Sequence, residues 1–440
     1  MKKYDSYKDT GLNWLGSIPE QWGFAKINYY SKIKTGGTPN KERPEYWENG
    51  TIRWMSSGEV NKEYVYEVAE RITDDGLKNS NASILPIDTV MIALNGQGKT
   101  KGTVALLRTE TTCNQSLAGF ICNEEKLNPL YLFFFLKSKY KQLRGLVGDG
   151  QREGITLSLL KSLFVPLPSI NEQRIIGEFL YYKTSQFDIL IQKKQQMIAL
   201  LEEEKTAVIN EAVTKGLNPD APLKDSGVDW LGAVPAHWEP KKLKYLVHLI
   251  NDSISTKSLS HKVALENIES NTGRLLEGEL SFEFKGCGSH FIKGDVLFSK
   301  LRPYLAKVYL AKEEGVAAGE LLVFRPKEEI WSEFLFYRIL SSDFIKEVNS
   351  STYGSKMPRA SWSFIEQLLI PIPSLKEQIE IIQHINDNIR RIESVKAKAF
   401  KEIKLMQEYR IALISEAVTG KIDVRDYQPE PINSQQLELA

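Results

Sequence analysis

Two long stretches of the chain carry apolar residues at a spacing of three and four, which is the pattern of one face of an α-helix. The first covers 169–214, with no proline and only one glycine, Gly177. At about 1.5 Å per residue, it would form a helix about 69 Å long. The second begins at Ser374 and keeps its stripe to Ala417. Because a narrow stripe on so long a helix cannot be buried alone, the pattern predicts two helices paired as a coiled coil.

The predicted helices begin with the same start signal. An S-x-x-E box stands at 169–172 and again at 374–377, each time directly after a proline. In such a box the serine accepts from the amide three residues on, and the glutamate reaches back to the serine amide. Gly216 and the Asn-Pro pair at 218–219 supply the stop of the first helix.

The remaining apolar runs are short, and their β-branched composition is typical of strands in mixed α/β or α+β domains. Two aromatic-rich segments, 129–138 and 333–342, predict short helices whose aromatic residues belong to a core. The candidate strands are 51–57, 88–94, 101–107, 262–268, 294–300, 307–312 and 320–326.

The chain also contains an internal repeat. The repeated pairs are GLNWLGSIPEQW (11–22) with GVDWLGAVPAHW (227–238), FVPLPSINEQRII (164–176) with LIPIPSLKEQIEI (369–381), and INEAVTKG (209–216) with ISEAVTGK (414–421). The first pair is offset by 216 residues and the other two by 205, so the second body is 11 residues shorter while the tails have equal length. Each half therefore has a fixed entry, a variable body and a fixed helical tail.

This order of segments predicts a topology. If the two helices pair antiparallel, the second helix returns to the first body. The two halves of the sequence repeat are then related by an approximate twofold axis, and the helices separate two heads. We call the bodies head 1 and head 2. The predicted domains are head 1 at 1–165, a first helix region at 166–216, head 2 at 217–370, a second helix region at 371–420 and a tail at 421–440.

Composition is that of a soluble globular protein, with 42% hydrophobic and 26% charged residues. No apolar run approaches the roughly 18 residues of a membrane span, and MKKYDSYKD at the N-terminus lacks an apolar signal core. Three cysteines argue against a disulfide framework and fit a reducing cytoplasm. The net charge is only +1, but residues 284–312 hold six basic side chains and a single acid. We therefore expect a cytoplasmic protein with locally basic loops.

The motifs that suggest catalysis are weak. ALNGQGKT at 93–100 fits a loose P-loop, yet the next residues are strand-like, whereas a P-loop needs a following helix. The segment that begins with Asn128-Pro129 distantly resembles the N-P-P-Y loop of adenine methyltransferases, but it is better interpreted as a helix cap. Cys287 and His290 have metal-like spacing with no second pair nearby, and we assign them a structural role. Since no Ser/His/Asp or paired-carboxylate constellation can be assembled, the chain is interpreted as non-catalytic.

Several loops instead carry the side chains that bind phosphates and base edges. KTGGTPNKERPEYW at 34–47 combines flexible glycines with hydroxyl, amide and basic groups, and Trp47 is its expected anchor. The candidate DNA-binding residues are Lys34, Thr35, Thr38, Asn40, Lys41, Arg43, Ser56, Asn95, Gln97, Lys99, Thr100, Lys101, Gln151 and Arg152 in the first body, and Lys285, Lys300, Arg302, Tyr304, Lys307, Lys356 and Arg359 in the second.

The layout resembles the specificity subunits of type I DNA restriction–modification enzymes over residues 1–420. The resemblance is carried by the two WLG-(S/A)-(I/V)-P-x-x-W entries, the GGTP…YW…IRWMS stretch at 36–56, and the P-(L/I)-P-S-x-x-E-Q openings at 166–173 and 371–378. It implies two target recognition domains that each read half of a split double-stranded DNA site. The helix pair would fix the length of the gap between the two half-sites.

The same resemblance implies partners and cofactors. Two methyltransferase subunits would use S-adenosylmethionine to methylate one adenine per half-site, and two restriction subunits would use ATP and magnesium. No cofactor would belong to this chain, and no membrane is involved. The near-neutral net charge differs from the basic charge of a simple DNA-binding protein. This difference is acceptable if the methyltransferases make many of the contacts with the DNA phosphates.

Three other interpretations stay open from the sequence. One is a P-loop NTPase with a coiled-coil arm, and another is a coiled-coil adaptor without DNA contact. A third is a recognition subunit of a related methylation system that lacks a nuclease.

Overall fold

A computed structural model of the chain describes residues 2–96, 98–145, 154–257, 259–276, 284–354 and 356–428. The chain forms two compact units. Unit 1 comprises Met1–Lys194 and Lys401–Ala440, and unit 2 comprises Gln195–Phe400. Each unit therefore holds one head together with a part of both long helices.

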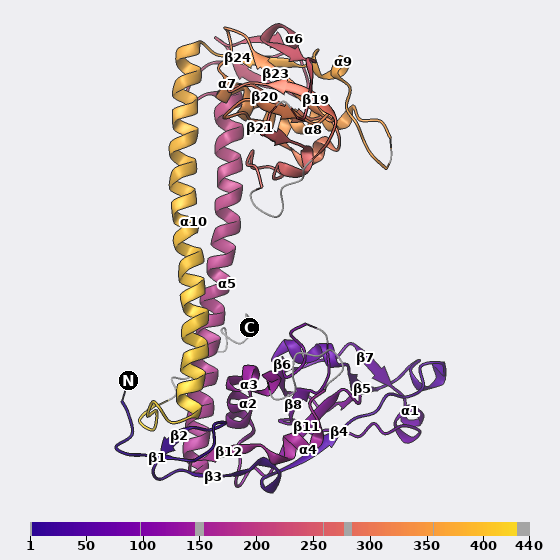
Figure 1. Cartoon of the computed structure of the whole chain (residues 1–440), viewed down its shortest axis with the longest axis vertical. Helices are drawn as coiled ribbons and strands as arrows, with labels where there is room; N and C mark the ends of the chain where they lie inside the picture. Colours follow the sequence, from indigo (N-terminus) through magenta and orange to yellow (C-terminus); the bar gives the residue numbers. More distant parts are fainter. Residues whose placement is uncertain are drawn as a thin grey trace. The chain divides into compact units, whose positions relative to one another are not determined.

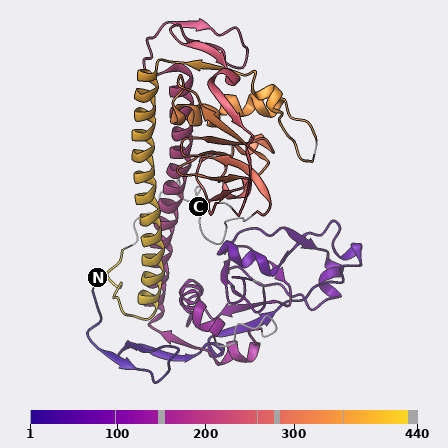
Figure 2. The same cartoon turned by 45° about the horizontal axis from the view of Figure 1, so that its top comes forward.

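The two predicted long helices are present. Helix α5 covers Ile170–Lys215 and helix α10 covers Leu375–Val418. They pack side by side, as Figures 1 and 2 both show. Within each unit, rising numbers along α5 meet falling numbers along α10, so the pairing is antiparallel. The contacts are Phe187–Tyr409 and Lys194–Glu402 in unit 1, and Glu202–Lys396 and Lys205–Glu393 in unit 2.

Head 1 is built on a mainly antiparallel sheet with the strand order β4-β11-β8-β9-β6. A smaller sheet, β10-β5-β7, contains the parallel pair β10–β5. The strands are β4 (Ser31–Thr35), β5 (Ile52–Met55), β6 (Tyr64–Val65), β7 (Glu70–Ile72), β8 (Val90–Ala93), β9 (Val104–Leu107), β10 (Thr112–Cys113) and β11 (Leu117–Cys122).

Short helices and strand pairs surround this sheet. Helix α2 (Pro129–Ser138) lies between the sheet and the long helices of unit 1, and the three phenylalanines at 133–135 are fully buried there (Figure 1). Asn128 caps α2 by accepting from the amide of Tyr131 at 3.0 Å, as the sequence predicted. The other elements are β1 (Tyr7–Asp9), β2 (Ser17–Pro19), β3 (Gly23–Lys26), η1 (Ile27–Tyr29), η2 (Pro44–Tyr46), η3 (Ser57–Lys62), α1 (Asp74–Lys78), α3 (Tyr140–Gly145), α4 (Leu157–Ser162) and β12 (Phe164–Leu167).

Among the described residues, head 2 repeats the central sheet with four strands rather than five, and its second sheet is arranged differently. Its central sheet has the order β16-β23-β20-β21, and its second sheet, β17-β19-β22-β18, again contains one parallel pair, β18–β22. The strands are β13 (Leu223–Asp225), β14 (Ala233–Pro235), β15 (Glu239–Lys242), β16 (Val247–Ile250), β17 (Ser253–Ser255), β18 (Lys262–Val263), β19 (Cys287–Phe291), β20 (Val296–Ser299), β21 (Val308–Leu310), β22 (Gly315–Ala317), β23 (Leu321–Pro326) and β24 (Leu369–Ile372). The helices are α6 (Leu243–Leu246), η4 (Leu265–Asn267), η6 (Pro303–Leu305), α7 (Ser332–Leu340), α8 (Ser342–Ser350) and α9 (Trp362–Ile365).

One predicted strand is largely wrong. The segment 262–268 pairs only as β18 (Lys262–Val263) and then turns into η4. The side chain of Asn267 accepts from the amide of Ala264 at 2.7 Å. Such a local bond from an asparagine side chain competes with strand pairing and bends the chain.

The predicted capping box at the start of α5 forms only in part. Ser169 accepts from the amide of Glu172 at 3.3 Å, as expected. The carboxylate of Glu172 instead accepts from the indole N–H of Trp22 at 3.1 Å and from the hydroxyl of Tyr4 at 2.6 Å. Burial, followed by the bond to Glu172, raises the pKa of Tyr4 well above its ordinary value, so the tyrosine remains a donor.

The second repeat is built in the same way. At the start of α10, Glu377 accepts from Trp238 at 3.0 Å and lies 3.0 Å from His237. The next residue of each box is also used alike. Gln173 and Gln378 are both buried, and each accepts from the backbone amide at the start of α2 or α7.

The repeated tails complete each junction. In unit 1 the end of α10 reaches Trp22, and a Cβ on Gly420 would lie 3.0 Å from that indole. In unit 2 the end of α5 reaches Trp238, and a Cβ on Gly216 would lie 3.2 Å from it. Both glycines have positive φ, +71° and +76°, the conformation that ends a helix. Thus the three repeated segments meet at one place in each unit.

Candidate nucleic-acid interface

The strand register brings several loops of head 1 to one end of its sheet. Thr35 pairs with Ala118, and Ala93 pairs with Leu117, so β4 and β8 both end where β11 begins. Strand β9 begins beside the end of β8. The loop after β4, the turn after β8 and the loop before β11 therefore emerge together. We call this edge the loop end of head 1.

The glycine pair 36–37 sits at the loop end, where it serves close packing rather than flexibility. A Cβ on Gly36 would lie 1.7 Å from the carbonyl oxygen of Cys113, and one on Gly37 would lie 2.7 Å from the amide of Ala82. The amide of Gly37 also donates to Cys113, and its carbonyl accepts from the indole of Trp54, both at 2.9 Å. The sequence had assigned these glycines to mobility, and this interpretation is corrected: the backbone there is held on both sides.

The loop that follows is anchored by Trp47. Its ring packs edge-on against Trp54 at 5.1 Å, and its N–H donates to the carbonyl of Asn40 at 3.1 Å. The ammonium of Lys41 lies 5.6 Å from the centre of the Trp47 ring. Arg43 donates to the hydroxyl of Tyr46 at 2.9 Å. The two cations are thus exposed but aligned by aromatic neighbours.

The glycine-rich turn after β8 leads into strand β9 within the described residues 98–107, so the helix that a P-loop needs is not there. Helix α3 clamps this turn, because Tyr140 donates to the carbonyl of Lys99 and Arg144 to that of Gly98, both at 2.7 Å. Asn95 and Lys99 are exposed, and Thr100 is half-buried. Lys101 is only 7% exposed, so its side chain points into the fold rather than to the surface.

The other candidates of head 1 differ in accessibility. Lys34 lies in β4 opposite Gly119, and Thr35 ends that strand. Ser56 precedes η3 and is half-buried, and its backbone amide donates to the carboxylate of Glu59 at 3.1 Å. Gln97, Gln151 and Arg152 lie outside the described residues.

A polar hollow opens at the loop end of head 1, with a volume of about 700 Å³. Thr38 and Asn40, two of the predicted candidates, line it. Its remaining polar side chains come from 78–81, directly after α1, and from Gln115, before β11. The sequence argument missed these two segments because neither is basic or motif-like, and only the register of β11 against β4 brings Gln115 near Thr38.

Head 2 has an equivalent loop end. Ser299 pairs with Leu321, and Phe298 with Val308, so β20 ends where β23 and β21 begin. The loop 300–307 emerges there and carries four predicted candidates. Arg302 has a left-handed backbone with φ of +50°, and Tyr304 is 51% exposed.

Two of the cations in head 2 are engaged within the chain. Lys307 donates to the carbonyl of Leu265 at 2.7 Å, and burial lowers its pKa. Arg359 forms a two-pronged ion pair with Glu320, at 2.8 Å and 3.3 Å, which holds the pKa of that carboxyl below its ordinary value. Lys300 lines the same small pocket as this ion pair, whereas Lys285 and Lys356 are exposed.

A partly buried ionic cluster connects head 1 to the long helices of unit 1. Glu63, which has a φ of +60°, pairs with Lys137 of α2 and with Arg410 of α10 at 3.0 Å. Arg410 also contacts Asp188 of α5 at 3.2 Å. Burial alone would raise the pKa of Glu63, but the two cations outweigh it, and the pKa lies below the ordinary value. The cluster fixes the contact between the head and both helices.

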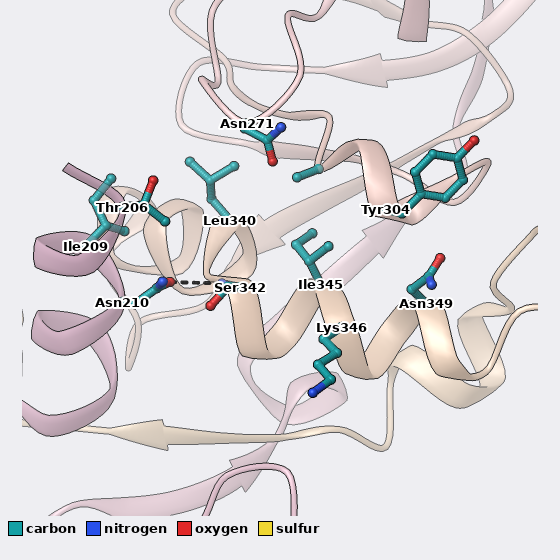
Figure 3. A pocket seen from close by; sticks show the side chains of 11 residues that line it. Thr206, Ile209, Asn210, Asn271, Tyr304, Leu340, Ser342, Ile345, Lys346 and Asn349 are labelled. Atoms are coloured by element: carbon teal, nitrogen blue, oxygen red, sulfur yellow. Dashed lines mark hydrogen bonds between the residues drawn. The ribbon is translucent and has the colours of Figure 1, made fainter. Parts of the chain in front are cut away.

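Each unit also contains a hollow between a helix tail and a head. In unit 2 it has a volume of about 280 Å³ and lies between α5 and α8, where Asn210 accepts from the amide of Ser342 at 2.9 Å (Figure 3). In unit 1 a hollow of about 470 Å³ lies between α10 and the segment 137–142. Ile209 lines the first hollow and Ile414 the second, and these residues are equivalent in the repeat.

The structure contains little that suggests metal or membrane chemistry. Across the described parts of the chain, no group of three or more His, Cys, Asp or Glu side chains is placed to hold a metal ion. His290 contacts Glu314 at 2.6 Å, and Cys287 is exposed at the start of β19. In the same ranges, none of the helices combines the length and apolarity of a bilayer-spanning segment.

Comparison with known proteins places both halves of the chain in one family. The family model described as the type I restriction modification DNA specificity domain matches twice, at 19–200 and 235–405. The type I restriction enzyme MjaIX specificity subunit of Methanocaldococcus jannaschii is 25% identical over 446 residues, covering 96% of this chain and 97% of that protein. The EcoR124I/EcoR124II specificity subunit of Escherichia coli is 28% identical over 182 residues, or 41% of this chain and 44% of that protein.

Solved structures show the same fold. A chain from a structural study of the assembly and conformational transition of the type I restriction–modification system aligns with a TM-score of 0.69, 15% identity, and coverage of 92% of this chain and 99% of that one. The HsdS subunit of Thermoanaerobacter tengcongensis aligns with a TM-score of 0.57, 15% identity, and coverage of 92% and 98%.

Proposed function

The chain belongs to the type I restriction–modification DNA specificity family, which is non-catalytic, and we propose that each of its two target recognition domains reads one half of a split double-stranded DNA site. The observation that carries this proposal is a shared frame with different loops. The central sheets of both heads share the order of four strands, and both heads have the same Trp–Glu junction with the helices. Their loop ends, however, differ in chemistry.

The difference lies in which side chains the frame displays. Head 1 presents amides, hydroxyls and one lysine around its polar hollow. Head 2 presents Lys300, Tyr304 and the Arg359–Glu320 pair. Base pairs are distinguished by the pattern of donors and acceptors along the major groove. Two heads with a similar fold but different loop side chains are therefore suited to reading two different half-sites. Arg302, Lys356 and Lys41 are suited to phosphate contacts.

The helix pair sets the distance between the half-sites in this proposal. Helices α5 and α10 are each long and continuous, and partly buried ion pairs such as Lys205–Glu393 fix their register within a unit. A helix is stiff compared with a linker of similar length, so it is suited to a fixed gap.

Two methyltransferase subunits would dock on the repeated segments, because the repeat presents the same surface twice. The two tail hollows are suited to this role, since each combines apolar helix residues with polar rims. S-adenosylmethionine would be held by those subunits, and ATP and magnesium by two restriction subunits. This chain would contribute no cofactor ligand.

The test is to co-express the chain with the methyltransferase subunit of its own system and to map methylated adenines across a genome. The proposal expects a split motif with a fixed gap that disappears when this chain is deleted. If methylation persists unchanged without this chain, while the partner is present and active, the proposal fails. Adding the neighbouring nuclease gene tests the restriction subunits, because cleavage should require all three components.

A further inference from the structure

The polar hollow of head 1 is made from three segments that are far apart in sequence. They are the loop after β4, the segment 78–81 that follows α1, and the loop before β11. Lys78, Asn79, Asn81 and Gln115 are exposed there. No carboxylate is among the described side chains that line it. The surface is therefore rich in hydrogen-bond donors and acceptors, with one cation and no acid to repel a polyanion.

The Gln115 carboxamide is restrained by one hydrogen bond. Its oxygen accepts from the hydroxyl of Thr38 at 2.7 Å, which orients the amide. An amide oxygen has a second lone pair, and its NH₂ has two donors, so the group can still form a bidentate contact. Glutamine and asparagine form such contacts with the N6 and N7 positions of adenine.

The backbone under these side chains is rigid enough for reading bases. Gly36 and Gly37 are packed against Cys113 and Ala82, so the loop that carries Thr38 cannot move independently of the segment that carries Asn81. Asn79 is also fixed, because it donates to the carbonyl of Asp75 at 2.9 Å. At the end of α1, Lys78 lies exposed at the rim of the hollow.

We infer that this hollow takes the major-groove edge of a DNA base pair, that Gln115 and Asn81 discriminate an adenine there, and that Lys78 contacts a flanking phosphate. The inference rests on the proposed function and assigns the specificity of head 1 to residues outside its basic loops. Asn81 and Gln115 belong to two different segments of the hollow's lining, which suits reading of an edge rather than stacking on a face.

The test uses the complex with its methyltransferase and four variants of head 1. Gln115→Glu keeps the shape of the side chain and an acceptor for Thr38 but removes the NH₂ donor. It also adds a negative charge that weakens binding to any DNA, so the loss of a base contact is judged from the change in the motif. Asn81→Ala removes an exposed amide, and Lys78→Ala removes the cation. The matched control is Asn28→Ala, because Asn28 is an exposed asparagine in η1, before the opposite end of β4. Methylated adenines are mapped for each, and affinity for the wild-type site is measured at several salt concentrations.

The inference expects Gln115→Glu and Asn81→Ala to weaken binding of the wild-type site by about 10- to 100-fold, which is the discrimination that a bidentate base contact provides. Each should change or relax one position in one half of the motif only. Lys78→Ala should weaken all sites alike and lower the salt slope by about 1. Asn28→Ala should match the wild type.

A split motif that stays intact in Gln115→Glu and Asn81→Ala, with affinities equal to that of Asn28→Ala, would overturn the inference and leave the proposed function standing. If the wild-type complex itself yields no split motif, the proposed function fails and the inference falls with it.

Discussion

The indole of Trp22 donates a hydrogen bond to the carboxylate of Glu172 at 3.1 Å, across 150 residues of sequence, and Trp238 does the same to Glu377 at 3.0 Å. The bond joins the repeated entry segment of each half to the start of its long helix. Trp22 is fully buried and Glu172 is 7% exposed. If one partner were removed, water could not reach the other to replace the lost hydrogen bond. This junction explains why the same twelve-residue segment occurs twice in the chain, while the sequences of the two heads differ.

Trp22→Phe should lower the free energy of unfolding of unit 1 by about 1–3 kcal/mol, because it removes the indole donor and leaves a buried carboxylate with fewer partners. Trp238→Phe should have a similar effect on unit 2. The measurement is denaturant unfolding of the full chain. Trp331→Phe is the matched control, since that side chain is 48% exposed. The junction is not a major source of stability if Trp22→Phe and Trp331→Phe unfold alike.

The ionic cluster in unit 1 gives a second stability test. Arg410→Met leaves the partly buried Glu63 with only Lys137, and because the Glu63 side chain is still 34% exposed, we expect a loss of about 1–2 kcal/mol. Thermal unfolding of unit 1 should therefore shift to lower temperature. Arg390→Ala is the control, because its pair with Asp387 is exposed and such pairs contribute little. Equal unfolding temperatures for the two variants would contradict the role assigned to the cluster.

Lys139 provides a pH-dependent test. Burial lowers its pKa from 10.5 to about 8, and its ammonium donates to the carbonyl of Trp14. The unfolded chain therefore binds this proton more tightly than the folded chain. The loss of folding free energy caused by burying the charged ammonium is fully present below about pH 8. It is relieved as the pH rises from about 8 towards 10.5.

Compared with Lys139→Met, the wild-type chain should be less stable at pH 7 by about 1–2 kcal/mol, a value reduced to allow for residual solvation of the ammonium. The difference should shrink as the pH rises to about 10. Unfolding of both proteins by urea at several pH values measures it. A difference that is constant over this range would show that the lysine does not titrate as its burial indicates.

Gly36→Ala tests the close packing at the loop end of head 1. The added Cβ would overlap the carbonyl of Cys113, so the loop must move, and we expect a loss of about 2 kcal/mol or more in the stability of head 1. The half of the methylation motif read by head 1 should be lost. Gly58→Ala should be tolerated, because a Cβ on Gly58 would have open space within 4 Å. An unchanged motif in Gly36→Ala would show that the loop is flexible after all.

Local signals in the sequence were sufficient for the helical part of the fold. The apolar stripe, the proline before Ser169 and the glycine at 216 define α5, because helix ends depend on a few neighbouring residues. The same logic found the cap of α2 at Asn128. The reciprocal bond of the capping box did not form, because a distant donor, Trp22, takes the carboxylate of Glu172, and no local pattern contains that information.

Composition alone pointed to loops that are basic or glycine-rich, such as 300–307, and their contact with DNA stays a prediction. Of these candidates, Lys101 is buried and Arg359 is paired with Glu320. Asn81 and Gln115 were not among the predicted candidates, because their place in the lining of the hollow depends on strand register and on the close approach of Gly37 to Ala82. These are long-range relationships that the sequence around each residue does not contain.

The most direct measurement replaces residues 22–165 by the corresponding segment of a relative with a different specificity and maps methylated adenines in cells that carry the methyltransferase. If each head reads its own half-site, one half of the motif will change to that of the donor, while the other half and the gap are kept. A motif that stays entirely unchanged, or that changes in both halves, would contradict independent reading by the two heads.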